Sequence, residues 1–274
     1  MLTKFVKYEG AGNDFIMIDN REEVFRADPR TIAHLCDRHF GIGADGLMTL
    51  SRSDEKNIAC RMHYYNSDGS EGEMCGNGAR CFTLFAHHLG LCTDRITFRA
   101  TDGLHSAELL SADDQKGEIR IGMIEVDTIR EGEGWLALNT GVPHYVEFVD
   151  DLAAVDLQGK GYAVCHDLTR FKEGTNVNFV REIGAGHIAM RTYERGVDNE
   201  TLACGTGATA AAIATHHARQ TDCTAFRIDV SGGTLRVDFK HNPTTGTYTA
   251  IRLEGPARRV FAGTIDCTNH EYIR

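Results

Sequence analysis

The sequence predicts an α+β protein made of two related halves. Three observations support this prediction: short segments with strand periodicity dominate the chain, few segments have helical periodicity, and one cysteine-containing unit occurs twice. The length of 274 residues is close to that of two domains. Apolar residues make up 42% and charged residues 25%, which is usual for a globular protein with a hydrophobic core.

The repeated unit recurs at a constant offset of 129 residues. Residues 75–88 read CGNGARCFTLFAHH and residues 204–217 read CGTGATAAAIATHH, with six of fourteen positions identical. The preceding segments MHYYN, from Met62, and MRTYE, from Met190, also resemble each other. Because the offset is nearly half the length of the chain, it indicates a duplicated domain.

Each unit has the same expected order of elements. In the first, IACRMHYY alternates as a strand, NSDGSEGEM is a polar loop, and FTLFAHHLG is a helical run that ends at Gly90. In the second, the strand HIAMRTY and the loop at 194–203 lead to the helix ATAAAIATHHARQ. Further strands, several of them separated by hairpin signals such as DDQKG and NPTTG, are expected at 96–100, 105–110, 118–123, 144–149, 176–180, 226–230, 234–239 and 248–253.

The boundary between the halves is expected at about residues 115–127. This boundary assigns residues 1–120 to an N-terminal half with Cys75, and residues 121–260 to a C-terminal half with Cys204. The last segment, residues 261–274, can return to the first half.

Charge and cysteine content restrict the function. The formal net charge of −10 gives no basic surface for nucleic acid or for an anionic membrane. Lysines and a glutamate interrupt the apolar residues of the N-terminus, and no apolar stretch approaches the roughly 18 residues of a membrane span. Nine cysteines, an odd number without regular spacing, indicate the reducing cytoplasm. The sequence does not determine the oligomeric state, and a homodimer is compatible with it.

Cys75 and Cys204 each come directly before a Gly-x-Gly turn that opens a helix. At such a position the free N–H groups and the positive end of the helix dipole lower the pKa of a thiol and favour the thiolate. The same N–H groups can hold a carboxylate, which the glycines allow to approach the backbone closely. Two such thiols on opposite faces of a carbon acid can remove a proton from one face and return one to the other. This general acid–base catalysis inverts the configuration.

No metal or cofactor is expected. The segment GIGADG at 41–46 lacks the complete dinucleotide fingerprint, and neither glycine-rich turn ends in the Lys-Ser/Thr pair of a P-loop. Cys75 with Cys81, and the pair His87 and His88, do not have a recognised zinc-ligand spacing. We interpret Cys81 and the histidine pairs at both helix C-termini as structural residues.

The two cysteine motifs resemble those of the diaminopimelate epimerase family. The resemblance covers nearly the whole chain, through GAGNDFIMID, GIGADG, NSDGSEGEMCGNGARC, GVPHYV, NVNFV and YERGVDNETLACGTGATA in this order. It implies two pseudo-symmetric domains, each with a mostly antiparallel or mixed sheet wrapped around a central helix, and a site in the cleft between them. It also implies an amino-acid substrate: LL-2,6-diaminopimelate and meso-diaminopimelate are interconverted without metal or cofactor, for lysine and peptidoglycan precursor biosynthesis.

The resemblance also implies a role for each matching residue. Cys75 and Cys204 match the catalytic base and acid, which exchange roles with the direction of the reaction. His144 and Glu194 match residues that tune the two thiols, and Arg195 offers two parallel hydrogen bonds to the distal carboxylate. The positions that match substrate contacts are Asn13, Asn66, Gly76, Asn77, Asn176, Glu194, Arg195, Gly205 and Thr206.

Two positions depart from the family pattern. Gly46 is found where some members have glutamine, and Val142 where many have asparagine, so fine substrate contacts are expected to differ. Proline or hydroxyproline racemases and phenazine-type isomerases remain alternatives, as does a non-catalytic amino-acid-binding or thiol-sensing protein. Asn77 argues against a proline racemase, whose motif has histidine there, and the presence of both cysteines argues against isomerases that lack one.

Overall fold

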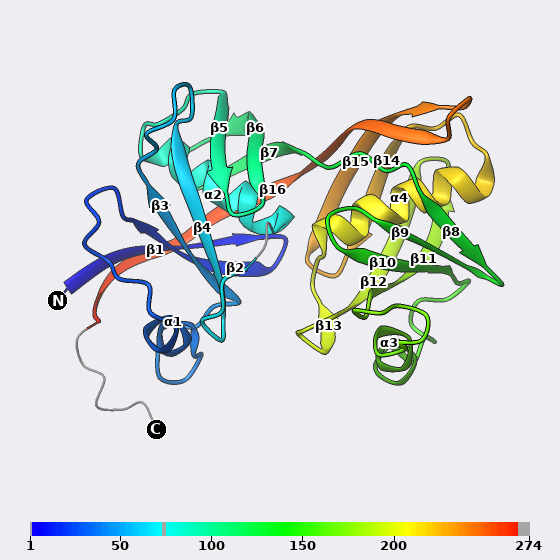
Figure 1. The fold of residues 1–274 in the computed structure, drawn as a ribbon, viewed down its shortest axis with the longest axis horizontal. Coiled ribbons are helices and arrows are strands. Elements are labelled where there is room, and N and C mark those ends of the chain that lie inside the picture. The colour runs from blue at the N-terminus through cyan, green and yellow to red at the C-terminus, as the bar shows by residue number, and fades with distance from the viewer. Residues whose placement is uncertain (1, 73–74, 268–274) are drawn as a thin grey trace. The chain divides into compact units, whose positions relative to one another are not determined.

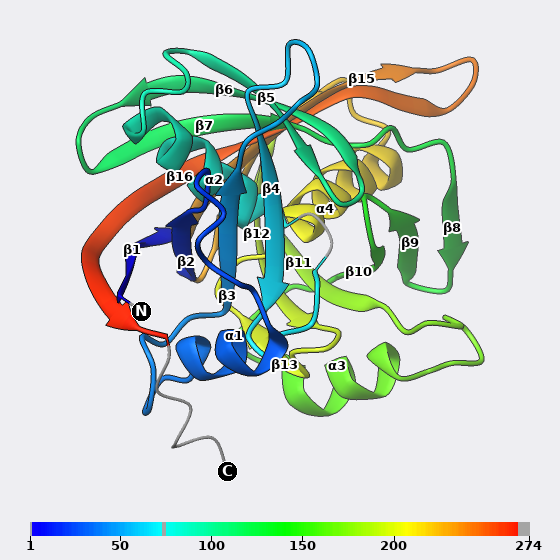
Figure 2. The ribbon, with the colours of Figure 1, turned by 60° about the vertical axis from the view of Figure 1, so that its left-hand side comes forward.

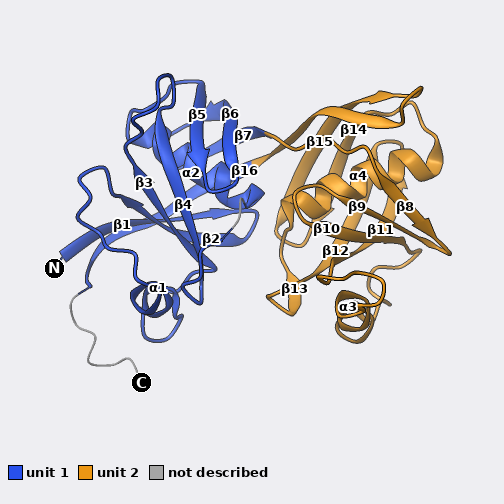
Figure 3. Ribbon diagram, in the orientation of Figure 1, with its two compact units in different colours: residues 1–121, 256–274 blue, residues 122–255 orange. Residues whose placement is uncertain are grey.

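A computed structural model describes residues 2–72 and 75–267, which form four helices and 16 strands (Figure 1). The chain divides into two compact units, residues 1–121 with 256–274 and residues 122–255 (Figure 3). Most elements are strands, and each unit contains one long helix against its sheet. The predicted α+β class is therefore confirmed.

Unit 1 has a sheet whose first and last strands pair with each other. Residues 258–266 of the last strand pair antiparallel with the first strand, from Glu9 opposite Arg258 to Leu2 opposite Asp266. The strands of unit 1 therefore form a closed series, in which each strand pairs with two others. In sheet order, the strands are β1 (Leu2–Gly10), β2 (Asn13–Asp19), β3 (Gly46–Ser51), β4 (Cys60–Asn66), β5 (Arg95–Ala100), β6 (Gly103–Ala112), β7 (Lys116–Gly122) and β16 (Thr247–Asp266).

Helix α2 (Gly76–His88) is the helix around which the sheet of unit 1 wraps (Figure 1). It packs against β1, β2, β3 and β6, and every residue from Gly76 to Ala86 is buried. The ring centroids of Phe82 in α2 and Phe98 in β5 are 5.1 Å apart. A helix that is buried on all its faces is typical of the centre of a domain, and here it confirms the predicted central helix.

Unit 2 has a second mixed sheet. Its β10–β11 and β12–β14 pairs are parallel and its other ladders are antiparallel. A short strand, β13 (Asn199–Thr201), pairs with β12 and lies inside the segment 194–203 that we predicted as a loop. In sheet order, residues 247–254 of β16 are followed by β15 (Gly233–Asn242), β14 (Ala225–Val230), β12 (His187–Glu194), β11 (Asn176–Gly184), β10 (Pro143–Phe148), β9 (Trp135–Asn139) and β8 (Ile129–Gly132).

Helix α4 (Gly205–Arg219) is the central helix of unit 2 (Figure 2). It packs against β9 to β12, β14 and β15. Small side chains let the strands approach this helix closely: the alanines at 208, 210, 211, 212 and 214 are all fully buried. Among the described residues, no helix is long and apolar enough to cross a membrane.

Two short helices have no counterpart among the predicted elements. Helix α1 (Pro29–Cys36) begins where the Asp28 carboxylate accepts a hydrogen bond from the main-chain N–H of Thr31. Helix α3 (Leu157–Cys165) begins with the same contact between Asp156 and Gly159. Aspartate is a favourable N-cap residue, but helices of eight and nine residues have too few turns to show a clear apolar period.

Candidate active site

Cys75 and Cys204 occupy the same position, as the N-cap residues of α2 and α4. Their backbones are extended, with φ −105° and ψ 122° at Cys75, and φ −122° and ψ 111° at Cys204. Each Sγ accepts a hydrogen bond from a glycine N–H three residues later, Gly78 or Gly207, both at 3.4 Å. The duplicated sequence thus forms a duplicated thiol cap, where helix N–H groups and the helix dipole favour negative charge on sulfur.

The glycines that we predicted as a turn before each helix form its first turn. Helix α2 begins at Gly76 and α4 at Gly205, directly after the two cysteines. The predicted substrate contacts Asn77 and Thr206 are therefore the second residues of these helices. Their main-chain N–H groups belong to the first turn, whose donors have no acceptor within the helix.

Four other cysteines have a different environment, although all nine cysteines are free thiols. Burial raises the pKa of the Cys36 and Cys60 thiols to about 12 and that of the Cys92 thiol to about 11. Cys81 is fully buried within α2, and burial raises its pKa as well. These four thiols stay protonated at neutral pH and do not offer a base.

In unit 1, a hydrogen-bond network leads from Cys75 to a buried arginine. The Cys75 thiol donates to Oδ1 of Asn13 at 3.6 Å, and the same oxygen accepts from Nδ2 of Asn77 at 3.4 Å. Oδ1 of Asn77 accepts from Nη2 of Arg80 at 2.9 Å. Arg80 is fully buried and donates through Nε to the main-chain oxygen of Pro256 at 3.2 Å. Two of the predicted substrate contacts, Asn13 and Asn77, therefore lie beside the thiol.

Arg80 was not among the predicted site residues, because an arginine in a helix usually lies on the surface. Its position three residues after Asn77, inside the first cysteine motif, was the available signal. Burial lowers the pKa of the Arg80 guanidinium, and a negative charge on Cys75 opposes this effect. A buried positive charge at this position stabilises a thiolate at Cys75.

Arg80→Met is expected to slow the alkylation of Cys75 at neutral pH by roughly tenfold, because the thiolate loses a stabilising charge. Mass spectrometry of the Cys75 peptide after timed exposure to iodoacetamide measures this rate. At high pH, where the thiolate dominates in both proteins, the two rates should converge. Arg61→Met, which removes an exposed charge from the same unit, is the control. An unchanged neutral-pH rate in Arg80→Met would contradict the electrostatic role.

Asn66 and Gly46 lie opposite each other on β4 and β3. Nδ2 of Asn66 donates to the Ser70 hydroxyl at 3.1 Å. A Cβ atom at Gly46 would lie 2.6 Å from the Tyr64 ring and 2.7 Å from the main-chain oxygen of Tyr65. A glutamine therefore does not fit here without main-chain movement, because its Cβ atom would be too close to the main-chain oxygen of Tyr65 as well as to the Tyr64 ring.

In unit 2, the loop between β9 and β10 contacts the start of α4. The Thr140 hydroxyl donates to the main-chain oxygen of Thr206 at 2.8 Å, and the Thr206 hydroxyl lies 3.4 Å from Sγ of Cys204. The half-buried Val142 lies in this loop, where its main-chain oxygen accepts from the N–H of Thr140 at 3.3 Å. Val142 is thus close to the second cysteine cap.

The other predicted residues of unit 2 meet at one end of β10, β11 and β12. His144 in β10 and Asn176 in β11 are register partners. Glu194 ends β12, and the next residue, Arg195, donates its main-chain N–H to Oδ1 of Asn176 at 2.9 Å. Nη1 of Arg195 donates to the main-chain oxygen of Glu173 at 2.6 Å, which holds the guanidinium in this loop.

A side chain at position 207 would come too close to its neighbours. A Cβ atom at this position would lie 2.5 Å from Oδ1 of the buried Asn178 and 3.2 Å from Sγ of Cys204. Gly207→Ala is therefore expected to lower the free energy of unfolding by about 1–3 kcal/mol and to reduce the rate of any reaction at Cys204. Chemical denaturation and turnover measurements check both effects.

Gly184→Ala provides the matched control, because a Cβ atom at Gly184 has no neighbour within 4 Å among the described residues and its backbone is not left-handed. This variant should unfold and react like the unaltered protein. Equal stability of Gly207→Ala and Gly184→Ala would contradict the predicted steric conflict.

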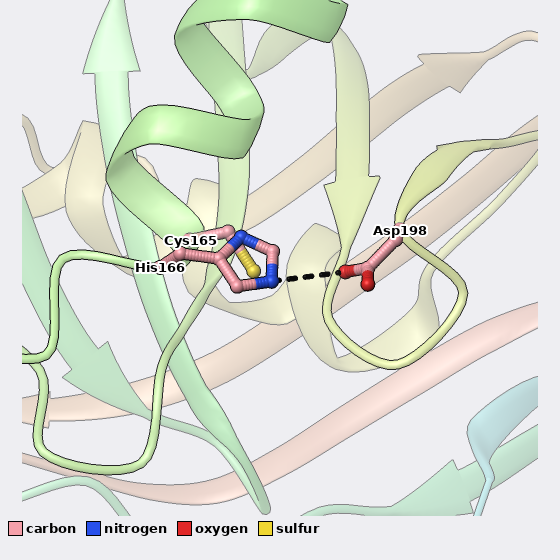
Figure 4. A group of neighbouring side chains, drawn as sticks. All are labelled: Cys165, His166 and Asp198. Carbon is pink, nitrogen blue, oxygen red and sulfur yellow. Dashed lines mark ion pairs between the residues drawn. The ribbon is translucent and has the colours of Figure 1, made fainter.

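One group of side chains in the described part of the chain could hold a metal ion: Cys165, His166 and Asp198 (Figure 4). Their ligand atoms lie within 4.8 Å of one another, and Nε2 of His166 is 3.5 Å from the Asp198 carboxylate. Burial raises the pKa of the Cys165 thiol, which disfavours the thiolate that a metal requires. The direct contact between the His166 ring and the Asp198 carboxylate accounts for this grouping without a metal ion.

A cavity of about 980 Å³ lies at the opposite end of α4 from Cys204. It is lined by residues of the last turn of α4, including His216 and His217, and by Trp135 and Tyr248. Nδ1 of His216 lies 2.9 Å from the Tyr248 hydroxyl. Although this cavity is large, it is not a candidate active site, because none of the predicted site residues lines it.

Known proteins resemble the chain along nearly its whole length. The model of the diaminopimelate epimerase family matches residues 5–126 and 136–260. The diaminopimelate epimerase of Flavobacterium psychrophilum is 43% identical over 263 residues, which are 96% of this chain and all of that protein. The diaminopimelate epimerase of Chlorobaculum tepidum is 39% identical over 264 residues, which are 93% of this chain and 98% of that protein.

Solved structures share the fold at low sequence identity. A Bacillus anthracis phenazine biosynthesis protein of the PhzF family has a TM-score of 0.78 at 12% identity, covering 97% of this chain and 99% of that chain. A hydroxyproline epimerase from Agrobacterium vitis has a TM-score of 0.70 at 13% identity, with coverage of 96% and 92%. The chain therefore shares its fold with proteins whose sequences differ from it at most positions.

Proposed function

Since the chain belongs to the diaminopimelate epimerase family, whose members are isomerases, we propose that it interconverts LL-2,6-diaminopimelate and meso-diaminopimelate. The observation that carries the proposal is the pair of identical thiol caps at Cys75 and Cys204, within a match to the family along nearly the whole chain. The reaction would serve lysine and peptidoglycan precursor biosynthesis in the cytoplasm and would need no cofactor or metal.

In the proposed mechanism, one cysteine thiolate takes the α-proton and the other cysteine thiol returns a proton to the opposite face. The first sulfur ends as a thiol and the second as a thiolate, so the reverse reaction exchanges their roles. Because opposite protonation states are required, the two thiols titrate as a coupled pair. The N–H groups at the start of α2 and α4 would hold the α-carboxylate and stabilise the charge that develops beside it.

The distal end of the substrate would be bound by polar side chains. Arg195 would form two parallel hydrogen bonds with the distal carboxylate. Oδ1 of Asn176 already accepts from the main-chain N–H of Arg195, so its Nδ2 is the atom that would donate to the substrate. Asn13 and Asn66 would complete the contacts, and His144 and Glu194 would tune the thiols.

Incubation of the protein with LL-2,6-diaminopimelate in D₂O tests the proposal. Formation of the meso isomer with deuterium at the inverted α-carbon is expected. L-Proline and trans-4-hydroxy-L-proline, assayed in parallel, should show neither inversion nor exchange. Exchange with one of these substrates alone would instead assign the chain to the related racemases. Binding of an amino acid without any exchange would favour the non-catalytic alternative.

A further inference from the structure

We propose that Asn178 is a positioning residue that fixes His144 as a neutral imidazole protonated on Nε2. In this form His144 donates a hydrogen bond to an anion in the site and does not act as a base. The nature of the anion rests on the proposed function. The position of the proton on the ring does not, because it follows from contacts within unit 2.

The orientation of the Asn178 side-chain amide follows from two buried contacts. Nδ2 lies 2.8 Å from the main-chain oxygen of Tyr145, and a carbonyl oxygen can only accept. Oδ1 accepts from the Thr192 hydroxyl at 3.0 Å. A flipped amide would place two acceptors against each other at Tyr145, in a region where Asn178 is fully buried. The nitrogen of this amide therefore faces Tyr145.

The same nitrogen determines the tautomer of His144. Nδ2 of Asn178 lies 3.1 Å from Nδ1 of His144. Because an amide nitrogen has two hydrogens and no acceptor lone pair, Nδ1 must accept and carries no proton. Burial lowers the pKa of the His144 imidazole to about 3, with the Arg195 charge as a second cause, so the ring is neutral at pH 7. Its single proton is then on Nε2.

The Nε2–H group is the part of the His144 ring that the described residues leave without an acceptor. His144 is fully buried, and Nε2 has no hydrogen-bond partner among the described residues. A buried N–H without an acceptor is unfavourable, so we assign it an acceptor that is present when the amino acid is bound. His144 is the register partner of Asn176, which binds the main chain of Arg195. The charge of Arg195 makes this environment favourable for an anion, either a carboxylate or a thiolate.

A neutral N–H donor suits a reaction in which negative charge develops on carbon. It stabilises that charge without becoming protonated or giving up its proton, as neutral imidazoles do in other enzymes that abstract α-protons. If His144 were instead held with its proton on Nδ1, a lone pair would face the same anion and would repel it.

Nitrogen-15 NMR of the full chain, labelled with ¹⁵N-histidine at pH 7, tests the inference directly. The His144 signals are identified by their absence in the His144→Gln protein. The expected spectrum has a protonated Nε2 and an unprotonated Nδ1 that accepts a hydrogen bond. An Nδ1–H tautomer or an imidazolium would overturn the inference.

Addition of meso-diaminopimelate should shift the Nε2–H resonance, and an unchanged resonance would overturn the donor role. The Cys75→Ala and Cys204→Ala proteins distinguish the two anions. A shift that persists in both variants identifies a carboxylate of the ligand, whereas a shift that one variant abolishes identifies the thiolate of that cysteine.

Two variants, Asn178→Asp and Thr192→Val, distinguish an effect of Asn178 on the His144 tautomer from an effect on packing. The aspartate carboxylate accepts and draws the proton to Nδ1, so we expect a reversed tautomer and kcat lower by about 10- to 100-fold, with little change in KM. Thr192→Val removes a hydrogen bond from the same buried network but leaves both Nδ2 contacts. It should keep the tautomer and most of the kcat.

Asn178→Leu, which removes the donor without adding a charge, is used if Asn178→Asp does not fold. It should leave both tautomers populated and kcat lowered. A reversed or mixed tautomer with normal kcat would overturn the positioning role. If the unaltered protein shows the expected tautomer but does not epimerise diaminopimelate, the proposed function fails while the assignment of the proton to Nε2 stands.

Discussion

Replacing Cys75 or Cys204 by alanine will lower kcat for diaminopimelate epimerisation by about 10²- to 10⁴-fold, the usual contribution of a positioned general acid or base. Each sulfur is the only proton carrier that the mechanism provides on its face of the α-carbon. Both cysteines are N-cap residues, and an alanine cap costs about 1 kcal/mol, so the variants should remain folded. Stopped assays of LL and meso isomers, with circular dichroism for folding, measure the two effects.

Cys92→Ala is the matched control for these variants. Cys92 is a half-buried thiol of unit 1 whose pKa burial raises to about 11, so its loss should leave kcat unchanged. An alkylating reagent should inactivate the unaltered protein, and the substrate should protect it. A folded Cys75→Ala or Cys204→Ala protein with more than about a tenth of normal turnover would contradict a mechanism with two bases.

Arg195→Met is expected to lower kcat/KM for both isomers by about 10²-fold, mainly through a higher KM. Hydrogen bonds to charged groups contribute about 1.5–3 kcal/mol, and the distal carboxylate would lose such contacts. Arg195→Lys should recover only part of the loss, because an ammonium group cannot form two parallel hydrogen bonds with a carboxylate. Initial-rate kinetics over a range of substrate concentrations separates KM from kcat.

Arg181→Met tests whether the loss of any positive charge from unit 2 has the same effect. Arg181 is exposed on β11, so its removal should change neither constant. If the Arg195→Met protein keeps the KM of the unaltered protein, the distal carboxylate is bound elsewhere.

The sequence was sufficient to predict the α+β class and the central helices because both depend on local patterns. Strand alternation and the repeat of Cys-Gly-x-Gly are visible within a few residues, and the repeat placed Cys75 and Cys204 at equivalent helix starts. The N-terminal hairpin was harder to recognise. Its turn is formed by Ala11 and Gly12, both with positive φ, instead of the Asn-Gly or Asp-Gly pair that usually marks such turns.

Features that depend on distant parts of the chain could not be predicted in this way. Arg80 is buried because its helix lies inside a sheet, and its Nε contacts Pro256, which is 176 residues away in sequence. The space beside Gly46 is filled by the Tyr64 ring from the neighbouring strand. The amide of Asn178 contacts His144 through the parallel pairing of β10 and β11. In each case the tertiary fold, and not the local sequence, determines which residue is the partner.

The pairing of β1 with the end of β16 has a consequence for synthesis on the ribosome. Residues 122–255 form a continuous unit that can fold as soon as they have emerged. Strand β1 must wait for Arg258 to Asp266, which are translated only after residues 122–255. Until then the nascent chain carries β1 with one edge unpaired, and such edges are prone to aggregation.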